Sequence, residues 1–330
     1  MTGPSLSTTL RQMRTGTPET PALALRRERA CGRYVLDGHP ATAPPLAPGL
    51  YLVATPIGNL RDITLRALEV LAAAAIIACE DTRRSRKLLD HYGIGRPVCA
   101  YHDHNAAMVR PKLLGRLAQG EAIALISDAG TPLVSDPGYK LAREARDQGY
   151  NVSALPGPSA LLAALTVSGL PTDRFLFEGF LPVKEAQRHS RIDALKSVPA
   201  TLIIFETGPR IAATLADLAA GLGVREVAVC RELTKLHEEV RRGELAALAR
   251  AYAGDAEVRG EFVIVIGPPQ DQAQLSSDDL DALLRDALDR LSVKEAVTEA
   301  AALTGAPRRL IYQRALALRG DQRAGTGEHG

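Results

Sequence analysis

The chain has 330 residues, of which 46% are hydrophobic, and its formal net charge at pH 7 is +2. This length suits two domains better than one, and the hydrophobic fraction is ordinary for a protein with a packed core. The balanced charge excludes a globally basic protein, so any surface that binds nucleic acid must be a local patch. The absence of Trp and the scarcity of Phe argue against an extended aromatic platform for single-stranded nucleic acid.

The cysteines and the apolar runs predict a protein of a reducing compartment. No two of the four cysteines form a CxxC pair, and Cys79 and Cys230 lie within apolar runs, as small core residues do. No apolar stretch approaches the roughly 18 residues that a membrane span needs, and no signal peptide is apparent. We therefore expect a cytoplasmic protein that contacts no membrane.

Residues 1–47 differ in composition from the rest of the chain. They are rich in proline, show little apolar periodicity and carry more arginine than acidic residues. We interpret them as a disordered extension, because such a segment buries too little apolar surface to fold. A basic arm that contacts RNA is the alternative.

Residues 48–171 alternate between apolar runs and helical patterns. The runs predict strands at residues 50–54, 75–79, 98–101, 122–127 and 152–155. The helical patterns fall at residues 62–74 with Asp62 as N-cap, at 82–92, between 101 and 122 with an interruption at Pro111, at 138–149 and at 159–168. This alternation predicts an α/β domain with a mostly parallel, doubly wound sheet.

Residues 172–270 predict a second α/β domain, and residues 271–330 predict a small helical appendage. The second domain has more strand patterns than helical ones, a ratio that favours antiparallel pairs in a mixed sheet. Its strands are expected at residues 175–177, 202–205, 227–230, 239–242 and 262–266. The appendage predicts helices at residues 278–290, 294–303 and 308–318, which could form a helix-turn-helix or an ordinary helical hairpin.

Turn-forming residues follow all five strands of the first domain. They stand at residues 55–59, 80–83, 101–105, 126–138 and 156–159, and residues 126–138 alone contain two Gly, two Pro and two Asp. Ligands of an open parallel sheet bind beyond the carboxyl ends of its strands. None of these loops is a P-loop or a GxGxxG fingerprint. We therefore predict a cleft in which backbone groups contact a nucleoside-containing ligand.

His102, Asp103 and His104 follow one of these strands, and they raise the question of a metal site. In an extended segment Asp103 points away from the two histidines, and no third spaced ligand is evident. We expect a polar lining or a capped turn and no metal.

Four basic residues crowd the start of one predicted helix: Arg83, Arg84, Arg86 and Lys87. A solvated helix face is the ordinary explanation of such a run. Its position at a strand end also suits contact with phosphate, which arginine binds in a forked geometry.

Taken together, the loops resemble the motifs of a known family. The motifs are Thr55-Pro56-Ile57-Gly58-Asn59, Glu80-Asp81-Thr82-Arg83, His102-Asp103-His104-Asn105, residues 127–138, Pro156-Gly157-Pro158-Ser159, Glu178-Gly179-Phe180-Leu181-Pro182 and Arg231-Glu232-Leu233-Thr234-Lys235. In order and spacing, over about residues 49–266, they resemble the ribosomal RNA small subunit methyltransferase I family of the tetrapyrrole methylase superfamily.

The resemblance implies two α/β domains with S-adenosylmethionine in the cleft between them, and a homodimer. It also implies 2'-O-methylation of a cytidine ribose in the decoding region of small-subunit (16S) ribosomal RNA, as naked RNA or in the assembled subunit. Gly130-Thr131-Pro132 stands where porphyrinoid-methylating relatives carry Gly-Asp-Pro, which fits the RNA branch. Residues 205–210 lack the histidine of a Tyr-Glu-Ser-x-His-Arg pattern, although Arg210 is retained.

Three sets of site residues follow from the loops and the resemblance. The cofactor is expected to contact Pro56, Gly58, Gly130, Thr131, Pro132, Ser135, Asp136, Pro156, Gly157 and Ser159, with Phe205 and Glu206 of the second domain closing over it. The candidates for removing the ribose proton are Asp81, Glu206, Glu232 and Lys235, the last two of which could equally form a structural ion pair. The expected RNA contacts are Arg83, Arg84, Arg86, Lys87 and Arg210.

Two other functions stay open at this point. A methyltransferase of the same fold could act on a porphyrinoid, although such an enzyme needs neither the basic cluster nor the helical appendage. A non-catalytic module could bind the cofactor and pass a signal through its C-terminal helices.

Overall fold

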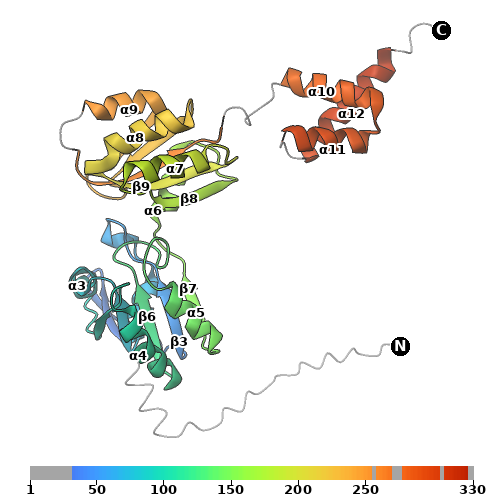
Figure 1. Ribbon diagram of the computed structural model, residues 1–330. Helices are drawn as coiled ribbons and strands as arrows, with labels where there is room; N and C mark the ends of the chain where they lie inside the picture. The colour runs from blue at the N-terminus through green and yellow to red at the C-terminus, as the bar shows by residue number, and fades with distance from the viewer. Residues whose placement is uncertain (1–31, 255–257, 270–276, 305–307, 326–330) are drawn as a thin grey trace, which may run out of the picture. The chain divides into compact units, whose positions relative to one another are not determined.

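The computed structural model describes residues 32–254, 258–269, 277–304 and 308–325. These residues form two compact units (Figure 1). The first unit contains the described residues up to Thr55 and Asp62–Gly157, and the second contains Pro56–Arg61 and the described residues from Pro158 onward. Among the described residues, no helix is both long and apolar enough to cross a lipid bilayer.

The first unit is built on a sheet of five strands that all run parallel, in the order β5-β4-β6-β3-β7. Its central strand, β6 (Ala122–Ile126), is buried along its whole length because helices cover both faces of the sheet. The predicted parallel, doubly wound sheet is thereby confirmed. The other strands are β3 (Gly49–Val53), β4 (Ile76–Cys79), β5 (Val98–Ala100) and β7 (Val152–Leu155).

Two helices cover each face of this sheet. Successive side chains of a strand point to opposite faces, so Tyr51 and Val53 of β3 enter one core while Leu50 enters the other. The helices of the first core are α2 (Leu65–Ala73) and α3 (Thr82–His91), and those of the second are α4 (Ala106–Ala118) and α5 (Tyr139–Asp147).

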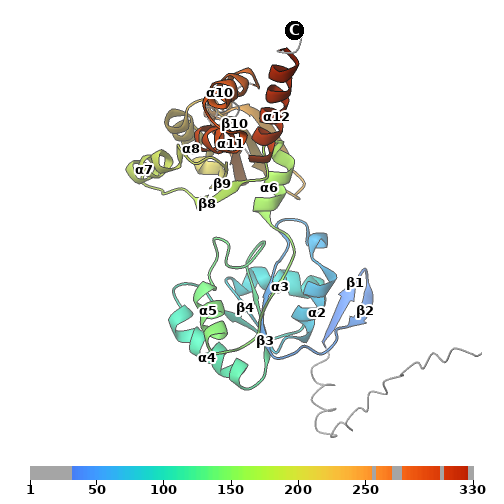
Figure 2. The same cartoon turned by 90° about the vertical axis from the view of Figure 1, so that its right-hand side faces the viewer.

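Residues 33–42 form a β-hairpin that belongs to the first core, which corrects the prediction of a disordered extension over residues 1–47. Strand β1 (Arg33–Leu36) pairs antiparallel with β2 (His39–Thr42), and Figure 2 shows the hairpin beside α2. Tyr34 is buried in the same core as α2, and the Val35 N–H donates to the Tyr92 carbonyl at 2.7 Å. The mostly exposed strand β2, which contains Pro40, has no apolar periodicity to reveal it. Residues 1–31 lie outside the described residues.

Two local expectations about helices are wrong. Helix α2 begins after Thr64, whose hydroxyl accepts a hydrogen bond from the Ala67 N–H at 3.1 Å, whereas Asp62 ends a short 3-10 turn, Leu60–Asp62. Helix α4 runs through Pro111 without a break. Leucines that follow Pro111 in the helix are buried against the sheet. Their burial outweighs the hydrogen bond that a proline inside a helix loses.

The second unit is built on a mixed sheet in the order β11-β10-β12-β9-β8, as predicted. Strands β8 and β9 pair in parallel, and every other neighbouring pair is antiparallel. The strands are β8 (Phe175–Phe180), β9 (Thr201–Thr207), β10 (Glu226–Arg231), β11 (Glu239–Glu244) and β12 (Glu261–Ile266).

Helices also cover both faces of the second sheet. On one face lie α7 (Glu185–Leu195), α8 (Gly208–Leu222) and α9 (Leu245–Ala253), and on the other lies α6 (Ala160–Ser168). Leu161 and Leu165 of α6 pack in one core with Ile203 and Val265 of this sheet. The chain therefore divides between Gly157 and Pro158, earlier than the predicted domain boundary at residue 171.

Three C-terminal helices share a small core of their own. They are α10 (Ser277–Arg290), α11 (Val293–Thr304) and α12 (Arg308–Gly325). Leu284, Ala300 and Ile311 are fully buried between them. Arg314 of α12 donates two hydrogen bonds to the Asp281 carboxylate of α10, each 2.6 Å long, and this forked pair fixes the register of the two helices.

Replacing Tyr34 by alanine tests whether the hairpin stabilises the first core. Removing a buried aromatic ring costs about 3 to 5 kcal/mol, so amide hydrogen exchange in β3 and α2 should rise in Tyr34→Ala, while exchange in β9 and β10 should not change. Mass spectrometry of the exchanged peptides measures both. Arg33→Ala, at an exposed position of the same strand, is the control, and equal exchange in the two variants would contradict the hairpin's place in the core.

Candidate functional site

The loops that follow β3, β6 and β7 meet at the carboxyl edge of the first sheet. Thr55 and Gly130 form an antiparallel bridge in which each N–H donates to the other residue's carbonyl at 2.9 Å. The Thr55 hydroxyl also donates to the Ser127 carbonyl at 3.1 Å. A Cβ on Gly157 would lie only 2.8 Å from the Ala54 Cβ, so the loop after β7 needs a glycine to approach β3. The predicted convergence of these three loops is present.

The loop after β6 is held in a strained conformation. Gly130, Leu133 and Ser135 have φ angles of +83°, +72° and +61°. For a residue with a side chain this left-handed conformation costs about 1 to 2 kcal/mol. The Ser127 hydroxyl lies 2.8 Å from Asp136 Oδ2 and ties the two ends of the loop together. Backbone strain of this kind persists only where surrounding contacts fix it, and it clusters at ligand sites.

Carboxylates gather at the ends of β4 and β6. Asp128 Oδ1 accepts a hydrogen bond from the Asp81 N–H at 2.9 Å. Burial raises the pKa of Glu80, and the charges of Asp128 and Asp136 add to the rise. Burial also raises the pKa of Asp136, against the hydrogen bond from the Ser127 hydroxyl, which lowers it. The charges of Asp128 and Asp136 therefore repel that of Glu80 at this edge of the sheet, and a cationic ligand would relieve this repulsion.

The loop after β5 is a capped turn, one of the two ordinary explanations that the sequence allowed. The Asn105 side-chain oxygen accepts a hydrogen bond from the His102 N–H at 2.9 Å, and its amide donates to the Ala100 carbonyl at 3.0 Å. The rings of His102 and His104 lie 6.0 Å apart, edge to face. Within the described ranges, no group of three or more His, Cys, Asp or Glu side chains is arranged to hold a metal ion.

Helix α3 presents the predicted basic cluster at this edge. The side chains of Arg83 and Arg84 are 94% and 67% exposed, and Lys87 is exposed as well. Arg84 lies 3.6 Å from Asp128. Arg86 is half-buried, and its guanidinium donates to a backbone carbonyl at 3.4 Å. The exposed members of the cluster are accessible to a phosphate, whereas Arg86 is partly committed to the fold.

In the second unit, Phe205 and Glu206 are neighbours in β9 but have different surroundings. The Phe205 ring packs edge to face against Phe177 and Phe180, with centroid distances of 4.8 and 5.8 Å. The Glu206 side chain is 0% exposed and accepts a hydrogen bond from the Thr214 hydroxyl at 2.7 Å. Glu206 therefore joins the end of β9 to helix α8, and its buried carboxylate is a poor candidate for contact with a substrate.

Arg210 belongs to the same buried network. Its guanidinium donates to the Leu181 carbonyl at 2.8 Å and lies 3.3 Å from the Glu206 carboxylate. The side chain is 26% exposed. These contacts give Arg210 a role in the fold of the second unit and argue against its predicted contact with RNA.

Glu232 and Lys235 form the ion pair that the sequence left open as an alternative. Lys235 Nζ lies 2.8 Å from Glu232 Oε1 and 2.8 Å from Glu261 Oε2. Burial alone would raise the pKa of Glu232, but the hydrogen bonds from Lys235 and from the Glu261 N–H lower it. Burial alone would lower the pKa of Lys235, but its two carboxylate partners raise it. Both shifts favour the charged pair and make each group less suited to accept a proton.

Gly58 lies against the same loop of the second unit. A Cβ at this position would overlap the Lys235 Cγ and would lie 2.9 Å from the Thr234 Oγ1. Glu232 and Thr234 have positive φ angles of +49° and +65°, so this loop is also strained. Close packing alone explains the glycine, and the contacts of Pro56 and Gly58 with a cofactor stay a prediction.

The predicted cofactor residues are divided between the two units. The first group lies at the carboxyl edge of the first sheet: Gly130, Thr131, Pro132, Ser135, Asp136, Pro156 and Gly157. The second group comprises Pro56, Gly58, Phe205, Glu206 and Ser159, the last of which caps α6 by accepting a hydrogen bond from the Leu162 N–H at 3.4 Å.

Two family models match the chain. Tetrapyrrole (Corrin/Porphyrin) Methylases matches residues 49–249, and the RsmI C-terminal HTH domain matches residues 274–319. Among curated proteins, Ribosomal RNA small subunit methyltransferase I of Mesorhizobium japonicum is 55% identical over 86% of this chain and 97% of its own length. The protein of the same description from Pseudomonas aeruginosa is 45% identical over 82% of this chain and 98% of its own length.

The chain belongs to the ribosomal RNA small subunit methyltransferase I family. The family predicted from the loop motifs is thereby confirmed, and so is the methyltransferase class of the enzyme.

Solved structures agree with the fold of this family. Diphthine synthase is 17% identical, with a TM-score of 0.53 over 66% of this chain and 89% of its own. The methyltransferase CobJ is 17% identical, with a TM-score of 0.51 over 67% of this chain and 94% of its own. Identity this low shows the fold alone.

The predicted loop motifs include Thr55, Glu80, Ser127 and Asp128, but none of them was assigned a role from the sequence, although these residues join the loops and contribute to the charge of the edge. Glu80 and Ser127 come directly after β4 and β6, and Asp128 and Thr55 come two residues after β6 and β3. A hydroxyl or carboxylate within two residues after a buried parallel strand is the signal that would have marked them as site residues. No sequence signal marks the positive φ angle of Leu133.

An asparagine at position 136 should stabilise the protein at neutral pH. Because the pKa of Asp136 is raised, the folded state binds its proton more tightly than the unfolded state. The free energy of unfolding therefore falls as the pH rises from the ordinary carboxyl pKa through the raised pKa of Asp136. Asp136→Asn removes this loss, so its thermal midpoint should exceed that of the wild type by a few degrees at pH 7 and converge with it in acid.

Circular dichroism melts between about pH 4 and pH 8 measure this difference, given the ordinary carboxyl pKa of about 3.9. Asp173→Asn, the same substitution at an exposed position, is the control. If Asp136→Asn were less stable than the wild type at neutral pH, the ionised carboxylate would be a net stabiliser of the loop.

Proposed function

We propose that this protein transfers the methyl group of S-adenosylmethionine to the 2'-hydroxyl of a cytidine ribose in the decoding region of small-subunit (16S) ribosomal RNA. The observation that carries the proposal is the 55% identity to a protein described as Ribosomal RNA small subunit methyltransferase I, over 97% of that protein. The relative's name indicates that the substrate is RNA and that the reaction is methyl transfer. The resemblance of the loop motifs implies that the methyl group goes to the 2'-oxygen and that the nucleotide is a cytidine.

Three observations favour RNA over a porphyrinoid as the substrate. Gly130-Thr131-Pro132 lacks the aspartate of the porphyrinoid-methylating pattern. The side chains of Arg83 and Arg84 are exposed at the edge where the loops converge. The match to a helix-turn-helix domain at residues 274–319 adds a module that is common in nucleic-acid-binding proteins.

The carboxyl edge of the first sheet fits S-adenosylmethionine, which combines a nucleoside with a positively charged sulfonium. Gly130 and Gly157 let the loops after β6 and β7 pack closely on the end of β3, through the bridge to Thr55 and the contact with Ala54. Burial is the main cause of the raised pKa of Glu80 and of Asp136, and the charge of Asp128 adds to both shifts, a repulsion that the positive charge would offset. Gly130, Thr131, Asp136 and Gly157 are the residues that would hold the cofactor. When bound, it supplies a methyl group activated by the sulfonium.

The protein has to orient the ribose hydroxyl and accept its proton. Of the four candidates, Glu206 is buried, and Glu232 and Lys235 are paired with each other. Asp81 is accessible at the end of β4, with 38% of its side chain exposed, and the hydrogen bond from the Arg83 N–H lowers its pKa. We therefore assign proton acceptance to Asp81. A carboxylate of lowered pKa is a weak base, so alignment, which supplies roughly 7 to 11 kcal/mol in favourable cases, has to provide most of the rate.

Methyl transfer from labelled S-adenosylmethionine to small ribosomal subunits tests the proposal. We expect label in the small-subunit RNA, and nucleoside analysis should identify 2'-O-methylcytidine. Label on a base would contradict methylation at the 2'-oxygen. Label on an added porphyrinoid alone would contradict RNA as the substrate. Subunits from cells that lack the protein are required, so that the target hydroxyl is free at the start.

Two variants connect this assay to the residues. Gly130→Val should abolish cofactor binding by calorimetry, because a β-branched residue is strained at a φ of +83° and would displace the buried loop from its bridge to Thr55. Gly130→Ala is the milder variant if the valine disturbs the fold. Asp81→Asn keeps an oxygen to cap α3, so it should lower kcat with little change in KM. An unchanged kcat would contradict the assignment of proton acceptance to Asp81.

Charge reversal on α3 tests the predicted RNA contacts. Arg84→Glu combined with Lys87→Glu should weaken RNA binding and flatten its salt dependence, because each phosphate contact to a single strand contributes about 0.7 to the slope of log K against log salt. Filter binding over a range of salt concentrations measures both. Arg250→Glu, at an exposed position of α9, is the charge control. If the variant and the wild type bound RNA with equal affinity at low salt, the cluster would be a solvated helix face that does not contact RNA.

Two finer expectations accompany the proposed function. We expect a homodimer, which the resemblance implies, and light scattering of the purified protein measures its mass in solution. We also expect a cytoplasmic location, because the proposed substrate is ribosomal RNA, and cell fractionation with an antibody against the chain tests it.

A further inference from the structure

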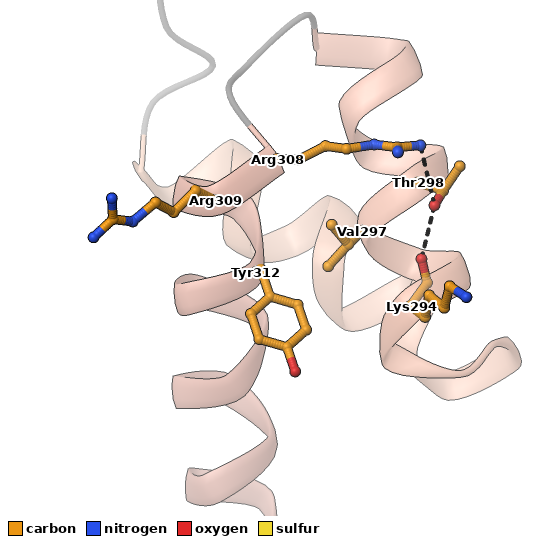
Figure 3. A pocket seen from close by; sticks show the side chains of 6 residues that line it. All are labelled: Lys294, Val297, Thr298, Arg308, Arg309 and Tyr312. Carbon is orange, nitrogen blue, oxygen red and sulfur yellow. Dashed lines mark hydrogen bonds between the residues drawn. The ribbon is translucent and has the colours of Figure 1, made fainter.

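A shallow hollow of about 320 Å³ lies between α11 and α12 (Figure 3). It is formed by helices of a single small bundle, and none of its residues belongs to the loops assigned above to the cofactor. It is called the α11–α12 pocket below. The residues that line it combine an apolar floor with a basic rim: Lys294, Val297, Thr298, Arg308, Arg309 and Tyr312.

The floor of the α11–α12 pocket offers a flat, accessible ring. Val297 is buried, whereas 48% of Tyr312 is exposed. Tyr312 follows Arg308 by four residues, so both side chains stand on one face of α12. Within the described part of the chain, no other aromatic ring packs against Tyr312. An exposed tyrosine ring beside a valine gives a stacking surface that the fold of the bundle does not use.

The rim of the pocket is positively charged. In the same bundle, Arg314 is paired with Asp281, and Arg290 with Asp286. Among the described residues, by contrast, no carboxylate lies within ion-pair distance of the three rim cations Lys294, Arg308 and Arg309.

Arg308 donates a long hydrogen bond of 3.5 Å to the Thr298 hydroxyl, and Arg309 extends from the opposite side of α12 (Figure 3). Helix α12 also begins at Arg308, so the positive end of its dipole adds to the charge of the rim. An anion is therefore the ligand that the rim would attract.

We propose that the α11–α12 pocket binds one unpaired nucleotide of RNA, with its base against the Tyr312 ring and the neighbouring phosphates on Arg308, Arg309 and Lys294. The inference rests on the proposed function for the identity of the nucleic acid. A ring and a basic rim are the two parts of sites that hold single-stranded RNA without reading its sequence. Since the pocket has a single ring, it holds one base and is not an extended platform.

The shape of double-stranded RNA supports this choice. In helix-turn-helix proteins the second helix enters the major groove of DNA. The major groove of an RNA duplex is too deep and narrow for side chains to read, and specific RNA recognition uses loops, bulges and ends. Helix α12 therefore contacts RNA at an unpaired position and does not lie in a duplex groove.

Binding of the full-length protein to a fluorescent single-stranded RNA of twelve mixed nucleotides, followed by anisotropy, tests the proposal. Tyr312→Ala should weaken binding about tenfold, because it removes a base-stacking contact. Tyr312→Phe keeps the ring and should bind as the wild type does. Arg308→Gln combined with Arg309→Gln should reduce the slope of log K against log salt by about 1.4, which is two phosphate contacts at about 0.7 each. Arg250→Gln on α9 is the matched charge control.

The outcomes separate this inference from the proposed function. If the wild type methylates ribosomal RNA while Tyr312→Ala and the double glutamine variant bind the oligonucleotide normally, the pocket inference is overturned and the function stands. If the wild type does not methylate but these variants lose affinity, the pocket stands and the function fails. Variants that lose affinity for small subunits but not for the oligonucleotide would make the pocket a docking site for a ribosomal protein, which also overturns the inference. The replaced arginines and Tyr312 are exposed, so thermal midpoints should not change.

Discussion

Parallel pairing in the first sheet is the constraint on which the candidate site depends. Because β3, β4, β6 and β7 run in one direction, their carboxyl ends stand at one edge and the loops after them have to turn there. The bridge between Thr55 and Gly130 joins two of these loops, and Asp128 joins the loop after β6 to the start of α3 through the Asp81 N–H. The strained backbone after β6 is tolerated because these contacts hold it from both sides. The geometry of the loops is therefore a consequence of the sheet.

The same edge carries charges of both signs, and their arrangement suits two different ligands. The carboxylates of Glu80 and Asp136 are partly buried, and burial makes their negative charge effective at short range. Arg83 and Arg84 point into solvent, where their charge acts over a Debye length of about 8 to 10 Å and is weakened by salt. A small cation held within the loops and a polyanion approaching from solvent would each meet the sign of charge that attracts it.

The sequence predicts the parts of this structure whose signal is local. The five strands of the first sheet are apolar runs followed by turn residues, and each appears where the pattern places it. The hairpin at residues 33–42 was missed because its order comes from packing against α2, through Tyr34, and not from its own periodicity. The domain boundary was placed too late because the apolar helix α6 could pack on either sheet. Glu206 was taken for a candidate base because a sequence does not reveal that Thr214 and Arg210 would surround its carboxylate.

Substrate choice in this family has to be decided outside the loops that would hold the methyl donor. The same donor serves small molecules and RNA, so a site shaped around it cannot distinguish between them. Phosphate contacts from α3 would supply affinity and orientation but no preference for one nucleotide, since every nucleotide carries the same phosphate. Selection of one ribose therefore needs a second point of contact that recognises an unpaired stretch of RNA. The exposed ring of Tyr312 on the C-terminal helices is suited to that contact, because a stacked base is held only where the RNA is single-stranded.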